Sequence, residues 1–151
     1  MLMKGILTIL LLALSIQLHA QSADVLYNQG KQLYDQKKYE LAYKKLLPAA
    51  QKGHKKAQYR LGRCYDKGHG VTEDNAKAYQ WYLKSAQQGH AKAQYRLAKC
   101  YMKGKGTTKD TAKAKVWMLK AIKNDKVKEK LKEDIADGDK TAIALKQFIG
   151  K

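Results

Sequence analysis

The sequence predicts an all-α protein in which helical hairpins stack one on the next to form a solenoid. The stretch AQYRLGRCY at residues 57–65 returns as AQYRLAKCY at residues 93–101, and the 36-residue windows that begin there share 19 identical positions. A fixed period of this length is typical of stacked helical or mixed units that share one core. Apolar residues also recur at steps of three and four, whereas the alternation of a strand is absent. Both observations favour helices throughout.

The first twenty residues have the layout of a secretory signal peptide. One Lys precedes the apolar run ILTILLLALSI, and the small residue Ala20 ends the segment. The run is well below the roughly 20 residues that a membrane-spanning helix needs, and no Cys follows it for lipid attachment. We therefore expect cleavage after Ala20, a periplasmic or secreted product without a transmembrane anchor, and one domain over residues 21–151.

Each repeat reads as a helix, a glycine loop and a second helix. The first helix has an apolar stripe that includes Ala57 and Leu61, and the second has one that begins at Ala78. Between them, Gly68 is predicted to end a helix in the left-handed conformation, and Asp74 to cap the next helix. Gly–His turns at residues 53–54 and 89–90 then begin new hairpins. The small residues Gly62 and Ala98 mark points where the two helices of a hairpin approach closely.

These residues resemble the Sel-one-like repeat family, whose members are relatives of the tetratricopeptide repeat. The pattern is AQYRLGRCYDKGHGVTEDNAKAYQWYLKSAQQGH, and the resemblance extends over residues 57–123. It implies a right-handed α/α solenoid with repeats at residues 54–89 and 90–125.

The flanking segments depart from this pattern. Residues 21–53 lack the glycine loop and resemble a plain tetratricopeptide unit. Residues 126–151 are expected to form capping helices over 126–137 and 140–149, joined by the turn DGD, because the terminal units of a solenoid are usually atypical.

The chain is strongly basic, with a formal net charge of +18 at pH 7. Loss of Lys4 with the signal peptide would leave +17. Such a surface attracts acidic proteins and polyanions, although solubility alone is an alternative explanation. Export and the absence of a recognised reading motif argue against specific binding of nucleic acid.

The sequence predicts no disulfide, metal site, cofactor or catalytic centre. Cys64 and Cys100 occupy equivalent positions in two repeats; packed helix axes lie about 8–10 Å apart, whereas a disulfide needs Cα atoms about 4.4–6.8 Å apart. We expect two unpaired thiols. The histidines at 54, 69 and 90 lie beside glycines in turns, without the spacing of metal ligands. The KGHG and KGKG loops lack a nucleotide-binding fingerprint, and no acidic pair is placed for acid–base chemistry.

A Tyr and a cation recur four residues apart on three successive first helices, which the resemblance makes the inner helices of the solenoid. We call them the first, second and third Tyr–cation pairs: Tyr27 with Lys31, Tyr59 with Arg63, and Tyr95 with Lys99. Lys56 and Lys92 are expected to flank the same concave face, whereas Arg60 and Arg96 are expected to point toward acidic neighbours. Tyr and basic side chains together suit carboxylates and phosphates. The alternative is that each Tyr packs against the next unit while the stem of the cation covers it.

The resemblance implies a non-catalytic adaptor that binds an acidic protein or peptide on a basic concave face. An immunity protein or a secretion-system accessory protein would fit this description. Binding of an anionic envelope polymer, such as peptidoglycan or lipopolysaccharide, is the alternative hypothesis. An enzyme that acts on cell-wall material is a more distant one.

Overall fold

The computed structural model describes residue 3, residues 5–9 and residues 21–150, and within these residues it contains helices and no strand. Most of the predicted signal peptide lies outside the described residues, so its cleavage stays a prediction. None of the described helices has both the length and the apolar character to cross a membrane. The helices are α2 (Ala23–Asp35), α3 (Tyr39–Gln51), α4 (Lys55–Lys67), α5 (Asn75–Gln87), α6 (Ala91–Lys103), α7 (Thr111–Ala121), α8 (Asp125–Ala136) and α9 (Lys140–Ile149).

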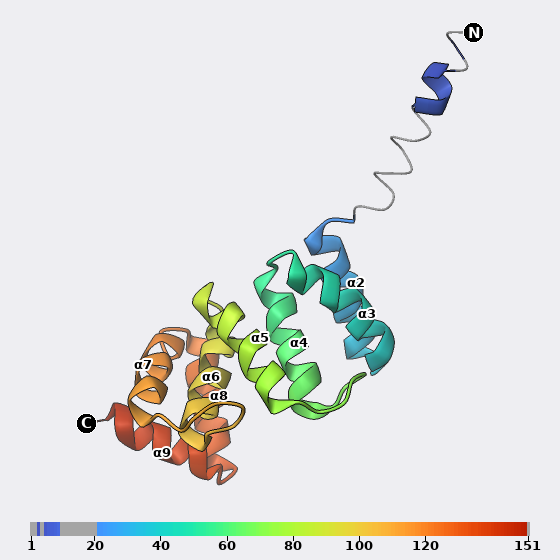
Figure 1. The fold of residues 1–151 in the computed structure, drawn as a ribbon. Coiled ribbons are helices and arrows are strands. Elements are labelled where there is room, and N and C mark those ends of the chain that lie inside the picture. Colours follow the sequence, from blue (N-terminus) through green and yellow to red (C-terminus); the bar gives the residue numbers. More distant parts are fainter. Residues whose placement is uncertain (1–2, 4, 10–20, 151) are drawn as a thin grey trace.

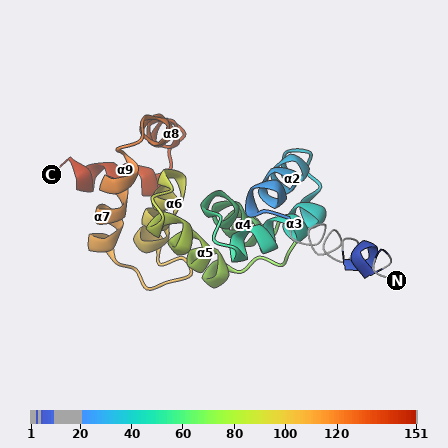
Figure 2. The same ribbon diagram turned by 90° about the horizontal axis from the view of Figure 1, so that it is seen from above.

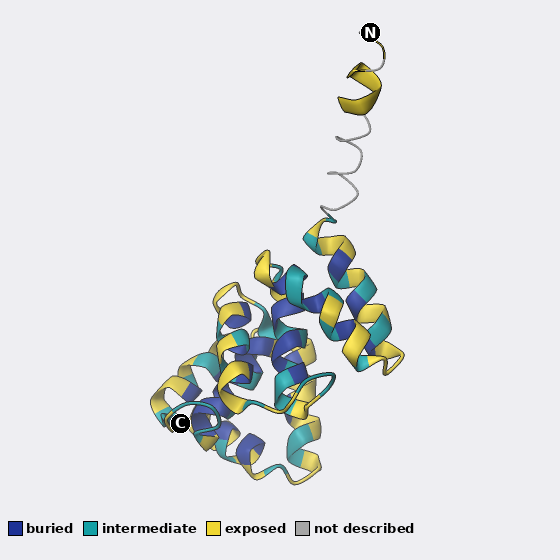
Figure 3. Cartoon of the chain, turned by 45° about the vertical axis from the view of Figure 1, so that its right-hand side comes forward, coloured by how far each residue is buried: buried dark blue, intermediate teal, exposed yellow. Residues whose placement is uncertain are grey.

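Consecutive helices pair into hairpins that follow one another in a curved row (Figure 1). Helices α3 and α5 each contact the first helix of the following hairpin, and α6 contacts both helices of the last hairpin. Figure 2 shows α8 on the side of the row that also carries α2 and α6. Buried residues gather where the helices face one another (Figure 3). The structure is the all-α solenoid that the repeats predict.

The glycine loops end and begin helices as the sequence predicts. Gly68 and Gly104 adopt the left-handed conformation, with φ of +65° and +70°, which glycine adopts without the steric cost of a Cβ atom. The carboxylates of Asp74 and Asp110 then accept hydrogen bonds from main-chain amides in the first turns of α5 and α7. These local bonds fix where each hairpin turns.

Histidine caps the inner helices of both repeats, a role that the sequence analysis did not assign. The Nδ1 atoms of His54 and His90 accept hydrogen bonds from the amides of Ala57 and Ala93, at 3.1 and 3.3 Å. At the start of α4 the imidazole thereby satisfies an amide that the first turn of a helix leaves without a partner, whereas the amide of Ala93 also bonds to the main-chain carbonyl of His90.

Small residues let the two helices of a hairpin pack closely. A Cβ atom on Gly62 would lie 2.6 Å from Cδ1 of Tyr82, and one on Gly30 would lie 2.7 Å from Cγ of Leu46. In the third hairpin Ala98 stands in the place of Gly62 and Met118 in that of Tyr82, and both are fully buried in one cluster. The size of the inner residue is therefore matched to that of the outer one.

Cys64 and Cys100 are both buried and unpaired, as their positions in the repeat predict. Burial raises the pKa of each thiol to about 11, because the interior disfavours the thiolate. Both behave as small apolar core residues.

Candidate functional site

A cleft of about 450 Å³ lies between the inner helices α4 and α6 and the capping helix α8. Its walls come from all three helices, so residues that are far apart in the sequence meet there. The lining residues are Tyr59, Arg63, Lys92, Tyr95, Arg96, Lys126, Val127, Lys130 and Glu133. Four of them, Tyr59, Arg63, Lys92 and Tyr95, are among the predicted binding residues.

The third Tyr–cation pair is covered by the capping hairpin. Tyr95 is 4% exposed, and its hydroxyl donates a hydrogen bond of 2.5 Å to Asp134. Lys99 donates to Asp134 at 3.2 Å and also to Asp139. The expectation that this pair lies open on the concave face is therefore wrong, because carboxylates from α8 and from the start of α9 already occupy it.

The ionisation of these groups follows from their contacts. Burial, followed by the hydrogen bond to Asp134, raises the pKa of Tyr95, so the phenol stays protonated and donates. Burial alone would raise the pKa of Asp139, but the hydrogen bond and charge of Lys99, together with hydrogen bonds from the amides of Ala142 and Thr141, lower it to about 2. The third pair therefore binds two ionised carboxylates at neutral pH.

The second Tyr–cation pair meets no carboxylate. Tyr59 packs against His90 with ring centroids 4.9 Å apart, and it hydrogen-bonds to Arg96. The guanidinium of Arg63 lies 5.5 Å from the ring centroid of Tyr34, and its buried Nε has no hydrogen-bond partner in the described part of the chain. Both residues of the pair line the cleft.

The first Tyr–cation pair lies outside the cleft. The ring of Tyr27 stacks on His54 with centroids 4.4 Å apart, and Lys31 forms an ion pair of 2.7 Å with Asp35 one turn further along α2. Lys56 is exposed, but it does not line the cleft either. The structure thus does not bring these three predicted residues together with the others.

Sequence reasoning missed three cations of the cleft: Arg96, Lys126 and Lys130. Arg60 does pair with an acidic residue, Asp35 at 3.4 Å, as predicted. Arg96 lies beside Tyr59 in the cleft and also has an acidic neighbour, Asp66, whose pKa its positive charge helps to lower. The two lysines belong to α8, which sequence analysis treated only as a cap.

The charge of the cleft is unbalanced. Among the described residues no ion pair involves Arg63, Lys92, Arg96 or Lys126. The single carboxylate of the lining, Glu133, is paired with Lys130 at 3.1 Å. Three cations, Arg63, Lys92 and Lys126, therefore face this space without an acidic partner in the described residues, whereas Arg96 has Asp66 near it. The described residues contain no cluster of three or more His, Cys, Asp or Glu that could hold a metal ion.

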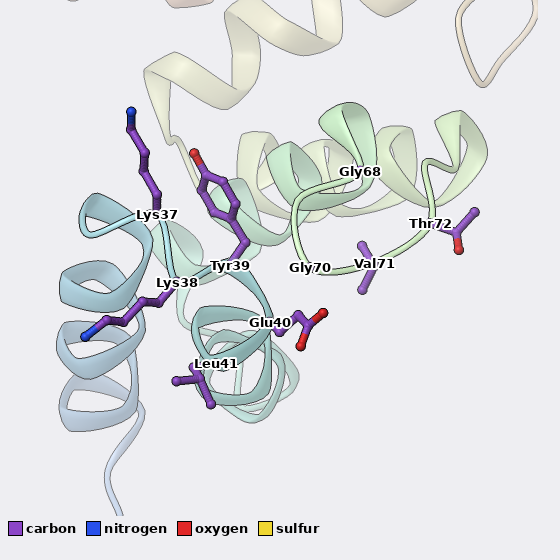
Figure 4. Close-up of a pocket in the computed structure, with 9 residues that line it drawn as sticks. All are labelled: Lys37, Lys38, Tyr39, Glu40, Leu41, Gly68, Gly70, Val71 and Thr72. Atoms are coloured by element: carbon purple, nitrogen blue, oxygen red, sulfur yellow. The ribbon is translucent and has the colours of Figure 1, made fainter.

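A larger hollow of about 750 Å³ lies between the α2–α3 turn and the glycine loop after α4 (Figure 4). It exists because the first hairpin lacks the glycine loop of the repeats, so its turn is short. The side chains of Lys37 and Lys38 are directed away from Gly68 and Gly70 in Figure 4. Because its cations do not converge, this hollow is a weaker candidate for a charged ligand than the cleft.

Comparison with known proteins identifies the repeats. The family model of the Sel1 repeat matches residues 55–90 and 91–126. A Sel1 repeat protein from Oxalobacter formigenes has a similar crystal structure, with a TM-score of 0.64 and 35% sequence identity over 82% of this chain and 54% of that one. A protective antigen of uropathogenic Escherichia coli strains that displays an SLR fold gives 0.62 and 30% identity over 86% of this chain. This chain spans only 54% and 30% of these two proteins. No curated protein matches it significantly.

Proposed function

Because the chain carries two Sel1 repeats in a helical solenoid, we propose that it is a non-catalytic interaction module that binds an acidic protein or peptide in the cleft between α4, α6 and α8. Sel1 repeats generally mediate protein–protein interaction. The partner engages the second Tyr–cation pair and the cations around it. Lys92 and Lys126 lie exposed at this cleft and are the side chains a partner meets first.

One observation carries the proposal: the third Tyr–cation pair already binds carboxylates. Tyr95 and Lys99 hold Asp134, and Lys99 also holds Asp139. The second pair has the same residue types at the same positions of the preceding inner helix, with Arg63 in place of Lys. A carboxylate from a partner would find there a phenol, a guanidinium and further cations, which are the donors that carboxylates bind most strongly.

The proposed location is the bacterial periplasm or envelope, and its support is the signal-like segment of residues 1–20. In that compartment the module acts as an immunity protein against a toxic effector or as an accessory of a secretion system. The net charge of +18 gives independent support to a second candidate, the binding of an anionic envelope polymer such as peptidoglycan or lipopolysaccharide.

Site-specific cross-linking in the native envelope tests the proposal. A photo-crosslinking phenylalanine analogue replaces Lys92 in one variant and Lys109, an exposed residue outside the cleft, in the control. We expect one acidic protein to be recovered from position 92 and not from position 109, and to be lost when Lys126→Glu is added. Equal recovery from both positions contradicts the cleft as the site. Recovery of polysaccharide alone favours the second candidate.

A further inference from the structure

Helix α8 shows how a helix is held on the inner side of this solenoid. Its inward face includes Val127, Leu131 and Asp134, which lie at positions i, i+4 and i+7 and so form one stripe; Ile135 packs against the same cluster at its edge. Val127 is 1% exposed and Leu131 is 6% exposed, both within the core cluster that contains α6 residues. The carboxylate of Asp134 follows them and binds the third Tyr–cation pair. Two apolar residues and one acid thus hold the helix in place.

The cleft extends the inner surface that α8 covers, from α6 to α4, the inner helix of the preceding repeat. Val127 and Lys130 of α8 form one wall, and Tyr59 and Arg63 of α4 lie on the other side. Stacked helices are spaced about 8–10 Å apart, so a second helix beside α8 would lie over α4 as α8 lies over α6. Its apolar residues would meet Tyr59, and its acid would meet Arg63 and Arg96.

A helical partner matches the spacing between the apolar and the basic side chains of the cleft better than an extended peptide does. In a helix, residues i and i+4 are about 6 Å apart along the axis, whereas in an extended chain they are about 13 Å apart. The contacts of α8 show that the inner surface accepts the compact spacing: Val127 and Leu131 are both buried, and Asp134 still reaches Tyr95.

We propose that the partner segment is an amphipathic helix that carries two apolar residues and one acid at positions i, i+4 and i+7 and lies beside α8 in the cleft. This inference rests on the proposed function and specifies the partner's conformation and sequence pattern. Helix α8 is its intramolecular counterpart. The occupant is a protein helix; an anionic polymer would need no such pattern.

Two peptides of equal composition test the pattern. The first has the sequence of residues 123–139 with the substitutions Lys126→Glu and Lys130→Glu, which remove the two lysines that would face the cleft cations. The second is a scramble in which the equivalents of Val127 and Leu131 no longer share a face with Asp134. Because both carry the same net charge, general attraction to the basic chain cancels between them. Affinity is measured by fluorescence anisotropy at physiological salt.

We expect the patterned peptide to bind the full chain at least about tenfold more tightly than the scramble, a difference of about 1.4 kcal/mol. The protein variant Lys92→Glu with Lys126→Glu should weaken its binding by about tenfold or more. The matched variant Lys44→Glu with Lys109→Glu, which changes the net charge equally at exposed sites outside the cleft, should change it less than about twofold. Isotope-labelled peptide should show helical Cα chemical shifts when bound.

The measurements separate a failure of the helix proposal from a failure of the proposed binding cleft. If the patterned and scrambled peptides bind with equal affinity, or if the bound peptide shows coil-like chemical shifts, the proposal that the partner binds as a helix is wrong. The basic cleft would then still be a site for acidic segments. An equal loss in both protein variants shows attraction by charge alone and overturns the cleft as well.

Discussion

The substitution Gly62→Ala probes how closely the two helices of a hairpin pack. The added Cβ atom would lie 2.6 Å from Cδ1 and 2.7 Å from Cε1 of Tyr82. Carbon atoms in contact are normally about 3.5–4.0 Å apart, so the ring or the helix must move by about 1 Å. Tyr82 is 1% exposed, so its ring is enclosed by the residues around it.

Two opposing effects set the magnitude. Overpacking a core costs about 1–3 kcal/mol, whereas replacing Gly by Ala inside a helix gains about 1 kcal/mol. Because the added atom overlaps two atoms of a buried ring, the upper part of the cost applies. We expect a net loss of about 1–2 kcal/mol in the free energy of unfolding, measured by urea denaturation, and a fall in Tm of about 3–6 °C.

The third hairpin supplies the compensating change. Ala98 and Met118 occupy the positions of Gly62 and Tyr82 there and are fully buried. In a Tyr82→Met background, Gly62→Ala should therefore become neutral or stabilising, since the thioether side chain leaves room for a methyl group. If Gly62→Ala has the same effect in both backgrounds, the close contact between these helices is not what determines the choice of glycine.

Three further predictions concern a cap, the capping hairpin and a loop. Burial, with smaller contributions from nearby cations, lowers the pKa of His90 from 6.5 to about 4; the unfolded chain therefore binds the proton first, and stability should fall as pH drops from about 6.5 to about 4. A His90→Asn variant should show a flatter profile of Tm against pH over this window. Asp134→Asn should destabilise by about 1–2 kcal/mol and speed hydrogen exchange in α8, whereas Asp137→Asn, at an exposed turn, should do neither. Gly106→Ala should cost at least about 2 kcal/mol more than Gly89→Ala in urea denaturation, because a Cβ atom would overlap main-chain atoms only at Gly106 although both have positive φ.

The sequence predicts the features that depend on local chemistry. Gly68 ends α4, and Asp74 caps α5, because a left-handed turn and an unpaired amide select these residue types wherever they occur. The period then places the two repeat hairpins in order, since both copies have the same local signals. These predictions need no knowledge of distant contacts.

The candidate site depends on distant contacts, so the sequence predicted only part of it. Tyr95 and Lys99 repeat the second Tyr–cation pair in sequence, yet acids 35–40 residues further along the chain cover them. The spacing of Val127, Leu131 and Asp134 is the signal that could have found this cover, because it places a carboxylate on the buried face of the last hairpin. Which inner helix that face meets depends on packing that no local pattern contains.

The two histidine caps each belong to two hairpins. His54 begins α4 and stacks on Tyr27 of the preceding hairpin, and His90 begins α6 and contacts Tyr59 in the same way. Opening one hairpin therefore removes a ring contact from the cap of the next one. Neighbouring hairpins of this short solenoid are therefore coupled in unfolding by imidazole rings as well as by buried apolar area. Replacing one of the two histidines should make thermal unfolding less cooperative.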